Sequence, residues 1–551
     1  MVPYNTPVAA SAVEPNSERE LVGIAQALGA LRVGPVSRGE KRLLATARSA
    51  SPDVIREFVE VIRRGGDPLG EAFCRLRAPA ERRPLGATYT PQPIIDAMIA
   101  STRRHEPARV VDPGAGSGRF LVAAGRAFPR AKLIAVEKDP LAALLCRAHL
   151  AAAGHARRSR VENRDFLDVT WSSVKGRTLF VGNPPYVRHH DVARSRKRWL
   201  SETAASLGLS ASQLAGLHVY FALRTATLGR PGDYGTFVTA AEWLDVNYGS
   251  LMRALLTGRL GVRSLHLVAP TARVFADAEA TAVITCFELG AKPTMVRLRV
   301  VNDVSELGSL SKGRDVPRER LAAEARWTPL FSAARRRPSG FVELGELCRV
   351  HRGQATGANR VWIAGSHSRM LPDSVLYRTI TRARELFAAG DVLSDVRELR
   401  RVIDLPAELD AVSPVERKAI ERFLTIAKSL GADRGFIATH RRAWWAVGLR
   451  EPAPILATYM ARRPPAFVRN PAGARHINVA HGLYPRDRLS TEKLDALARY
   501  LGSSTRLADG RTYSGGLTKF EPKEMERLLV PAPSLLAAGI DPTRADRGKL
   551  G

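Results

Sequence analysis

The segment 183–186, Asn-Pro-Pro-Tyr, has the groups needed to bind and activate an aromatic amine. It follows the apolar run 179–181, so we expect it at the end of a buried strand. The Asn183 side-chain carbonyl and the Pro184 backbone carbonyl are two hydrogen-bond acceptors, and Tyr186 offers an aromatic face. Both N–H bonds of an NH2 group can therefore be accepted while the attached ring stacks on Tyr186. The alternative interpretation is a tight turn that only closes the strand.

A glycine-rich segment upstream, residues 112–118, predicts a ligand-binding loop. Gly114, Gly116 and Gly118 let the backbone turn tightly and approach a ligand with no Cβ in the way. Ligands of open α/β sheets bind at the carboxyl ends of the strands, where this loop is expected. The Asp-Pro pair ahead of the glycines does not favour NAD, and no Gly-Lys-Ser/Thr follows to form a phosphate-binding loop.

Acidic residues at the ends of successive predicted strands could complete a site for an adenosine-type ligand. Asp112 ends the first strand and Glu137 the second, where a carboxylate can accept hydrogen bonds from both hydroxyls of a ribose. Asp165 could accept a hydrogen bond from an adenine amino group, and Phe166 could cover the ring. Each carboxylate taken alone is better interpreted as a solvated loop residue. Their order and spacing favour the ligand site.

The elements that must position these residues alternate between strand and helix. Apolar runs predict strands at 109–111, 132–136, 178–181, 235–239, 262–267 and 282–289, with 296–301 as an edge strand. Helical periodicity predicts helices at 93–101, 119–128, 140–153, 217–228 and 249–256. This alternation indicates an α/β fold with a doubly wound, mostly parallel, Rossmann-like sheet.

Four parts are predicted along the chain. Residues 1–80 read as a short N-terminal helical extension, and residues 81–302 contain the sheet. Residues 303–326 are polar and weakly periodic, which predicts a linker or a connecting excursion. Residues 327–551 have many Pro and Gly interruptions and predict a separate mixed α/β domain.

The composition favours a globular protein with a polyanionic partner. The 551 residues are 45% hydrophobic and 25% charged, and 84 Lys+Arg against 54 Asp+Glu give a net charge of +30. Such an excess predicts nucleic acid first, and a generally basic surface is the alternative. The four cysteines form no Cys-x-x-Cys or Cys/His cluster, so we expect no metal site and no disulfide, in a reducing cytoplasm. No apolar run is long enough to span a bilayer, so no membrane is expected as a partner.

These motifs, in this order, resemble those of class I S-adenosylmethionine-dependent methyltransferases, and specifically the gamma-class, Taq-type N6-adenine DNA methyltransferases. The resemblance covers about residues 84–300 and extends more loosely to the C-terminal part, where 353–359 and 513–519 are similar to the opening and close of a target-recognition domain. Residues 86–91 resemble the motif that contacts the cofactor's methionine moiety. Phe275 matches the aromatic that stacks on the flipped base; packing in the core is the alternative for this side chain.

The resemblance implies methyl transfer from S-adenosyl-L-methionine to adenine N6 in double-stranded DNA, with the base flipped out of the duplex. It assigns catalysis to Asn183, Pro184 and Tyr186, and base stacking to Tyr186 and Phe275. The implied cofactor-binding residues are Thr88, Tyr89, Thr90, Asp112, Gly114, Gly116, Gly118, Glu137, Asp165, Phe166 and Asn183.

The resemblance also implies partners and leaves alternatives open. The partners are double-stranded DNA and a cognate restriction endonuclease or other defence-system subunits, in the cytoplasm with the nucleoid. Asn-Pro-Pro-Tyr also occurs in enzymes that methylate RNA bases or glutamine in release factors, although these usually lack a C-terminal extension of domain size. A non-catalytic DNA-binding subunit is a second alternative, against which the intact motifs argue.

Overall fold

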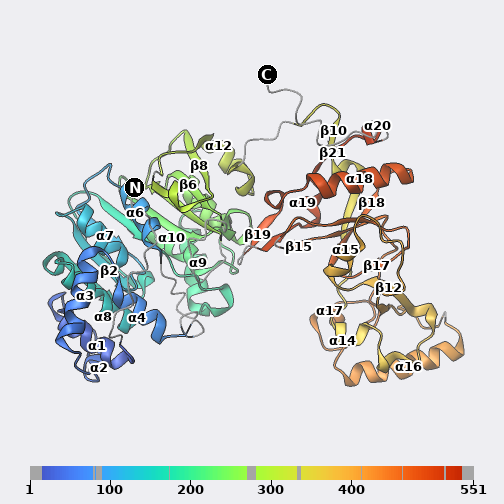
Figure 1. Ribbon diagram of the computed structural model, residues 1–551, viewed down its shortest axis with the longest axis horizontal. Helices are drawn as coiled ribbons and strands as arrows, with labels where there is room; N and C mark the ends of the chain where they lie inside the picture. Colours follow the sequence, from blue (N-terminus) through green and yellow to red (C-terminus); the bar gives the residue numbers. More distant parts are fainter. Residues whose placement is uncertain are drawn as a thin grey trace. The chain divides into compact units, whose positions relative to one another are not determined.

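The structure, a computed structural model, shows a chain that divides into two compact units, residues 1–333 and 334–551 (Figure 1). The residues that it describes are 15–78, 81, 90–172, 174–269, 281–308, 310–331, 337–410, 412–461, 463–513 and 517–536.

The first unit is built on one nine-stranded sheet with the order β3-β2-β1-β4-β5-β7-β6-β8-β9. Most neighbours pair in parallel, whereas β7 is antiparallel to β5 and β6, and β9 is antiparallel to β8. The strands are β1 (Arg109–Asp112), β2 (Lys132–Glu137), β3 (Ser159–Asn163), β4 (Thr178–Gly182), β5 (Tyr234–Ala240), β6 (Val262–Val268), β7 (Ala282–Glu288), β8 (Met295–Val301) and β9 (Arg314–Pro317).

Helices cover both faces of this sheet, which is the doubly wound arrangement expected from the sequence. One face packs against α6 (Gln92–Ser101), α7 (Arg119–Ala127) and α8 (Pro140–Ala152). The other face packs against α9 (Arg194–Ser206), α10 (Leu217–Leu228), α11 (Ser250–Thr257) and α12 (Arg318–Ala323). The central strands β1 and β4 are buried along their whole length, because they are covered from both sides.

Residues 303–326, which the sequence predicts as a linker, lie instead within the first unit. Residues 314–317 form the edge strand β9, and Val316 and Leu321 are buried in the core of the sheet together with Trp327. The strand is only four residues long and half charged, so its own sequence gives no periodic signal. The predicted edge strand β8 is therefore an inner strand.

The N-terminal extension consists of α1 (Glu18–Ala27), α2 (Arg38–Leu44), α3 (Pro52–Arg64) and α4 (Pro68–Leu76). Helix α3 begins at the predicted signal: the Ser51 hydroxyl caps Val54 N–H, and Pro52 occupies the first turn. It ends at Gly65, which has a φ of 105°. The apolar faces of the four helices pack on α8 as well as on one another.

The second unit is a mixed α/β assembly of small sheets. Its strands are β10 (Phe341–Glu343), β11 (Cys348–Arg352), β12 (Leu376–Ile380), β13 (Arg401–Ile403), β14 (Ile455–Thr458), β15 (Met460–Ala461), β16 (Phe467–Arg469), β17 (Arg475–His476), β18 (Ala480–Pro485), β19 (Arg511–Tyr513), β20 (Leu517–Lys519) and β21 (Leu529–Pro531). The largest sheet has four strands in the order β11-β18-β14-β16.

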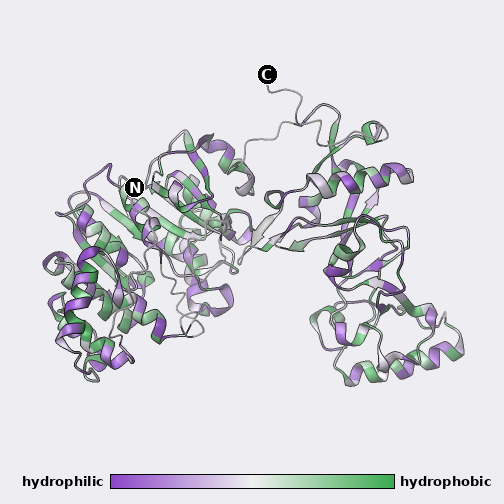
Figure 2. Cartoon of the chain, in the orientation of Figure 1, coloured by the Kyte–Doolittle hydropathy of each residue, from purple (hydrophilic) through white to green (hydrophobic). Residues whose placement is uncertain are grey.

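The helices of this unit are α13 (Leu344–Leu347), α14 (Asn359–Trp362), α15 (Ala383–Ala389), α16 (Pro414–Ser429), α17 (Phe436–Thr439), α18 (Thr491–Ser504), α19 (Pro522–Glu526) and α20 (Pro533–Leu536). The two long helices, α16 and α18, alternate hydrophilic and hydrophobic residues, as helices with one solvent-facing side do (Figure 2).

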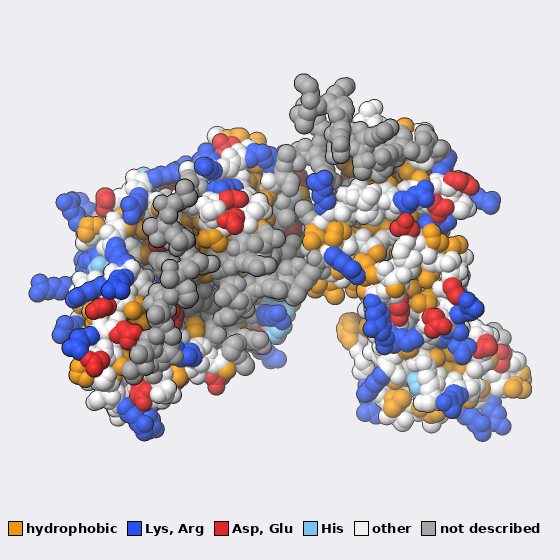
Figure 3. Space-filling model, in the orientation of Figure 1, with side chains coloured by type: hydrophobic (Ala, Val, Ile, Leu, Met, Phe, Trp, Pro, Cys, Tyr) orange, Lys and Arg blue, Asp and Glu red, His pale blue; other side chains and the backbone are white. Residues whose placement is uncertain are grey.

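On the one face of the molecule that Figure 3 shows, the positive charge is spread widely. Lys and Arg side chains occur on this face of both units rather than in a single patch (Figure 3). None of the helices described is both long and apolar enough to cross a membrane.

Candidate active site

A pocket of about 510 Å³ lies at the carboxyl ends of β1, β2 and β4. This volume lies within the range of sites that bind small ligands and cofactors. Of the residues that the sequence predicts for the site, the pocket is lined by Thr90, Gly114, Gly116, Glu137, Asp165, Phe166 and Asn183. Segments far apart in the sequence, from residue 90 to residue 183, therefore converge on one cavity.

The glycine-rich loop forms one wall, and its glycines have different functions. Gly116 has a φ of 53°, lines the pocket and has no neighbour where a Cβ would be. Gly118 has a φ of 90° and begins α7; a Cβ there would lie 2.8 Å from Cys146 Sγ. Gly118 thus allows α7 to pack on α8 and does not itself line the pocket.

Asp112 lies behind the loop, fully buried, rather than in the pocket wall. Its Oδ1 accepts a weak hydrogen bond from Gly114 N–H at 3.4 Å, and Oδ2 has no hydrogen-bond partner. Burial raises the pKa of the Asp112 carboxyl to about 8. Gly182 at the end of β4 approaches so closely that a Cβ there would lie 2.5 Å from Asp112 Oδ1. Asp112 therefore shapes the junction between β1 and β4.

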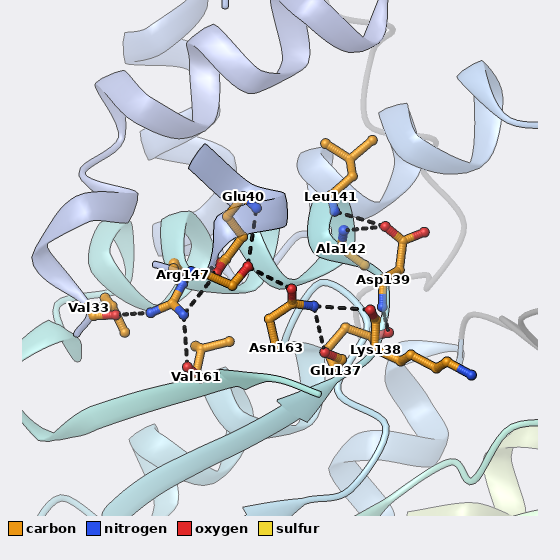
Figure 4. Close-up of polar contacts among 11 residues, drawn as sticks. Val33, Glu40, Glu137, Lys138, Asp139, Leu141, Ala142, Arg147, Val161 and Asn163 are labelled. Carbon is orange, nitrogen blue, oxygen red and sulfur yellow. Dashed lines mark hydrogen bonds and ion pairs between the residues drawn. The ribbon is translucent and has the colours of Figure 1, made fainter. Parts of the chain in front are cut away.

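Glu137 is held at the end of β2 by two backbone amides, of which that of Asp139 is drawn in Figure 4. Its Oε2 accepts from Gly116 N–H and its Oε1 from Asp139 N–H, both at 2.8 Å. Burial raises the pKa of Glu137, and these amide hydrogen bonds act in the opposite direction. The carboxylate is thus fixed beside the glycine-rich loop, where the hydroxyls of a ribose could donate to it.

Asp165 and Phe166 begin the turn after β3, and Asp165 is held from two sides. Its Oδ1 accepts from Leu167 N–H, and its Oδ2 accepts from Arg196 Nη2 of α9, both at 3.0 Å. Arg196 also binds both carboxylate oxygens of Asp168, which lowers the pKa of Asp168. Phe166 packs against Phe221 of α10 with ring centroids 5.2 Å apart, so an apolar surface lies beside the carboxylate.

The Asn-Pro-Pro-Tyr segment leaves β4 at the same edge of the sheet. Asn183 Nδ2 donates to Thr90 Oγ1 at 3.1 Å, which fixes the orientation of the amide. Pro184 is buried, and Tyr186 lies beside the pocket rather than in its wall. The Tyr186 hydroxyl is buried without a hydrogen-bond partner, and burial raises its pKa. The phenol is therefore neutral, and its ring is the part suited to contact a ligand.

Some predicted residues cannot be placed, and some lining residues were not predicted. Thr88, Tyr89 and Phe275 lie outside the described residues. The sequence interpretation missed the lining residues Phe73, Ser117, Arg119, Lys138, Asp139, Arg196 and Phe221. Arg196 could have been found only by recognising residues 194–206 as a helix. That segment is strongly basic and has little helical periodicity, so its sequence gives only a weak helix signal.

Comparison with known proteins agrees with this geometry. The chain matches the family model described as N-6 DNA Methylase over residues 67–219, and the C-terminal domain of the type II methyltransferase M.Eco57I over residues 330–546. It is 49% identical to the type II methyltransferase M.XamI of Xanthomonas campestris pv. amaranthicola, over 90% of this chain and 92% of that protein. It is 22% identical to the type II methyltransferase M.AccI of Acinetobacter calcoaceticus, over 63% of this chain and 67% of that protein.

The fold is also similar to that of a solved structure. The type IIL restriction-modification enzyme MmeI, in complex with DNA, aligns with a TM-score of 0.51 and 13% identity, over 91% of this chain and 79% of that chain. The sheet order, the pocket at its carboxyl edge and the extent of the sequence identity converge on one conclusion. The chain belongs to the N6-adenine DNA methyltransferases, among the type II enzymes of restriction-modification.

Proposed function

We propose that the pocket binds S-adenosyl-L-methionine and that the Asn183 segment presents adenine N6 of a flipped base to the cofactor. The carboxylate of Glu137, held by Gly116 and Asp139 amides, would accept from the ribose hydroxyls. Asp165 would accept from the cofactor's adenine amino group beside the Phe166 ring. The pocket thus offers two fixed acceptors, an apolar surface and adequate volume, which fit an adenosine-type ligand.

The cofactor supplies an activated methyl group, so this chain needs to position the acceptor amine more than to provide acid or base. The N6 lone pair is delocalised into the adenine ring, which makes the amine a weak nucleophile. Asn183 Oδ1 and the Pro184 carbonyl would accept both N–H bonds and favour a more nucleophilic nitrogen. Thr90 supports this by holding Asn183 Nδ2, which directs the carbonyl of the amide toward the substrate.

Base flipping would place the target adenine against Tyr186. Stacking on an aromatic side chain contributes about 1–3 kcal/mol per base, which offsets part of the cost of unstacking the duplex. We assign Phe275 to the opposite face of the base on the sequence resemblance alone. Residues 334–551 would read the DNA sequence, and a restriction endonuclease of the same specificity would be the functional partner.

The observation that supports this function most directly is Asn183 at the pocket edge, oriented by Thr90. Asn183→Ala is therefore expected to abolish methyl transfer to DNA while S-adenosylhomocysteine still binds, because Glu137 and Asp165 would hold the adenosine moiety of the cofactor. Transfer is measured with tritiated cofactor and binding by calorimetry. Asn302→Ala, an exposed asparagine after β8, is the matched control.

Unchanged methyl incorporation in Asn183→Ala would contradict the catalytic assignment. Long-read sequencing of DNA from cells that express the chain then identifies the modified base and its sequence context. Methylated RNA or protein in place of N6-methyladenine in DNA would favour the alternative substrates.

A further inference from the structure

The N-terminal helices contribute directly to the proposed cofactor pocket. Phe73 of α4 lines the cavity and is 2% exposed. The helices also share a hydrophobic core with α8, the helix that follows Glu137. The sequence of these helices contains no motif that assigns them a function. Their role is therefore inferred from their contacts with the pocket.

Asp67, which caps α4, connects this helix to the glycine-rich loop. Its Oδ1 accepts from Gly70 N–H at 2.8 Å, the contact that starts the helix. Its Oδ2 accepts from the Ser117 hydroxyl and from Arg119 Nε, the latter at 2.9 Å. Asp67 is 2% exposed and does not line the pocket, so it cannot act on a ligand except through these neighbours.

The same contacts extend to the catalytic segment. Arg119 Nη1 donates to the Thr90 backbone carbonyl at 2.9 Å, and the Thr90 hydroxyl accepts from Asn183. One buried carboxylate is therefore two residues away from the amide that we assign to catalysis. The Asp67 carboxylate at the start of α4 therefore contacts the glycine-rich loop directly and Thr90 through Arg119.

Two further contacts join the N-terminal helices to the opposite wall of the pocket. Ser37 Oγ donates to Asn163 Oδ1 at 2.7 Å, and Asn163 Nδ2 donates to the carbonyls of Glu137 and Lys138, each at 3.0 Å (Figure 4). Arg77 forms an ion pair with Asp139, which follows Glu137 and also lines the pocket. The helices thus contact both the glycine-rich loop and the end of β2.

We propose that α4 is a wall of the cofactor pocket and that Asp67 is a positioning residue for the glycine-rich loop. This inference rests on the proposed function, because it takes the ligand to be S-adenosylmethionine. A loop with three glycines has high conformational freedom, and hydrogen bonds from Ser117 and Arg119 to one buried carboxylate restrict it before the ligand binds. Loss of the carboxylate should therefore weaken binding more than it slows transfer.

Asp67→Asn tests the inference, because the amide can still cap α4 but cannot accept equally from Ser117 and Arg119. We expect the Kd for S-adenosylhomocysteine and the KM for S-adenosylmethionine to rise about tenfold, the effect of losing hydrogen bonds to a charged group. We expect kcat at saturating cofactor to stay within about threefold, because Arg119 can still reach the Thr90 carbonyl.

Glu40→Gln is the matched control. Glu40 is fully buried and pairs with Arg147 at 2.6 Å, in the same set of contacts between the N-terminal helices and α8, but neither residue lines the pocket (Figure 4). Glu40 Oε2 also accepts from Ser37 N–H at 2.6 Å, a hydrogen bond that the amide oxygen of the variant can keep, so the contact of Ser37 with Asn163 is retained. It should lower the Tm at least as much as Asp67→Asn does, with an unchanged Kd. Phe73→Leu keeps the carboxylate and shortens the wall, so it should raise the Kd in a protein that folds even if Asp67→Asn does not.

Wild-type affinity in Asp67→Asn or Phe73→Leu would overturn the proposal. So would a Kd that rises equally in Glu40→Gln, since the helices would then act only through overall stability. Absence of S-adenosylhomocysteine binding in the wild type is a different result: it would contradict the proposed function before any variant is examined.

Discussion

At the scale of single residues, burial sets the charge state of the group behind the glycine-rich loop. The pKa of Asp112 is raised from 3.8 to about 8, mainly by desolvation and further by the nearby Glu137. The carboxyl is therefore neutral at pH 7 in the folded protein and ionised in the unfolded chain. Its contribution is to the geometry of the loop through Gly114 rather than to a charge in the pocket.

Asp112→Asn should stabilise the protein in a pH-dependent way. Below about pH 3 the carboxyl is protonated in both states, so up to about pH 4 the wild type and the variant should differ little. Between pH 4 and 8 the unfolded wild type loses its proton while the folded form keeps it, so wild-type stability falls as pH rises. The variant has no such loss, and its advantage should grow to roughly 4 kcal/mol near pH 7. Denaturant unfolding at pH 4 and pH 7 measures it; an advantage that is equal at both values would contradict the neutral carboxyl.

At the scale of elements, α9 holds the turn that follows β3. Arg196 binds Asp165 and Asp168 together, and all three residues line the pocket. Arg196→Gln should free the Asp165 carboxylate and raise the Kd for S-adenosylhomocysteine by about threefold to tenfold. Calorimetry measures the Kd, with Arg198→Gln as the control, because Arg198 is an exposed residue of the same helix outside the pocket. Equal affinities of the two variants would show that Asp165 needs no such support.

The elements also show which features the sequence could predict. Strands such as β1 and β4 are short apolar runs with the glycine-rich loop or the Asn-Pro-Pro-Tyr segment directly after them, so the local pattern located both the sheet and the pocket edge. Strands β3 and β9 are short and polar, and they exist because a neighbouring strand offers a hydrogen-bonding edge. The sequence of the strand itself does not show that such a neighbouring strand is present.

The missed parts of the site have the same physical origin. Phe73 and Arg196 reach the pocket from residues before and after the predicted motifs, through packing of α4 and α9 against distant segments. Helix α9 is rich in Arg and Lys and has only two buried residues, so its sequence is typical of a solvated helix. Asp112 illustrates the reverse: its position in the motif suggested a ligand contact, and tertiary packing placed it behind the loop.

At the scale of the whole molecule, the net charge of +30 favours binding to DNA, and part of this charge lies close to the Asn-Pro-Pro-Tyr segment in the sequence. In the first unit, basic residues follow the Asn-Pro-Pro-Tyr segment closely in the sequence: Arg188, His189, His190, Arg194, Lys197 and Arg198. Desolvation lowers the pKa of His189, and the neighbouring His190 and Lys197 lower it further. In the described part of the chain, no acidic side chain pairs with Arg194 or Arg198. We propose that this basic surface contacts phosphates beside the target base.

Arg194→Gln combined with Arg198→Gln should weaken DNA binding and reduce its salt dependence. Each phosphate contact contributes about 0.9 to the slope of log K against log salt, so losing two contacts should flatten the slope by about 1.8. Fluorescence anisotropy with a duplex over a range of NaCl concentrations measures the slope, and S-adenosylhomocysteine affinity should not change. Lys41→Gln with Arg42→Gln removes the same charge from α2, away from the pocket. Because a general loss of charge would affect both pairs equally, an equal change of slope would mean that the surface after the catalytic segment has no preferred contact with DNA.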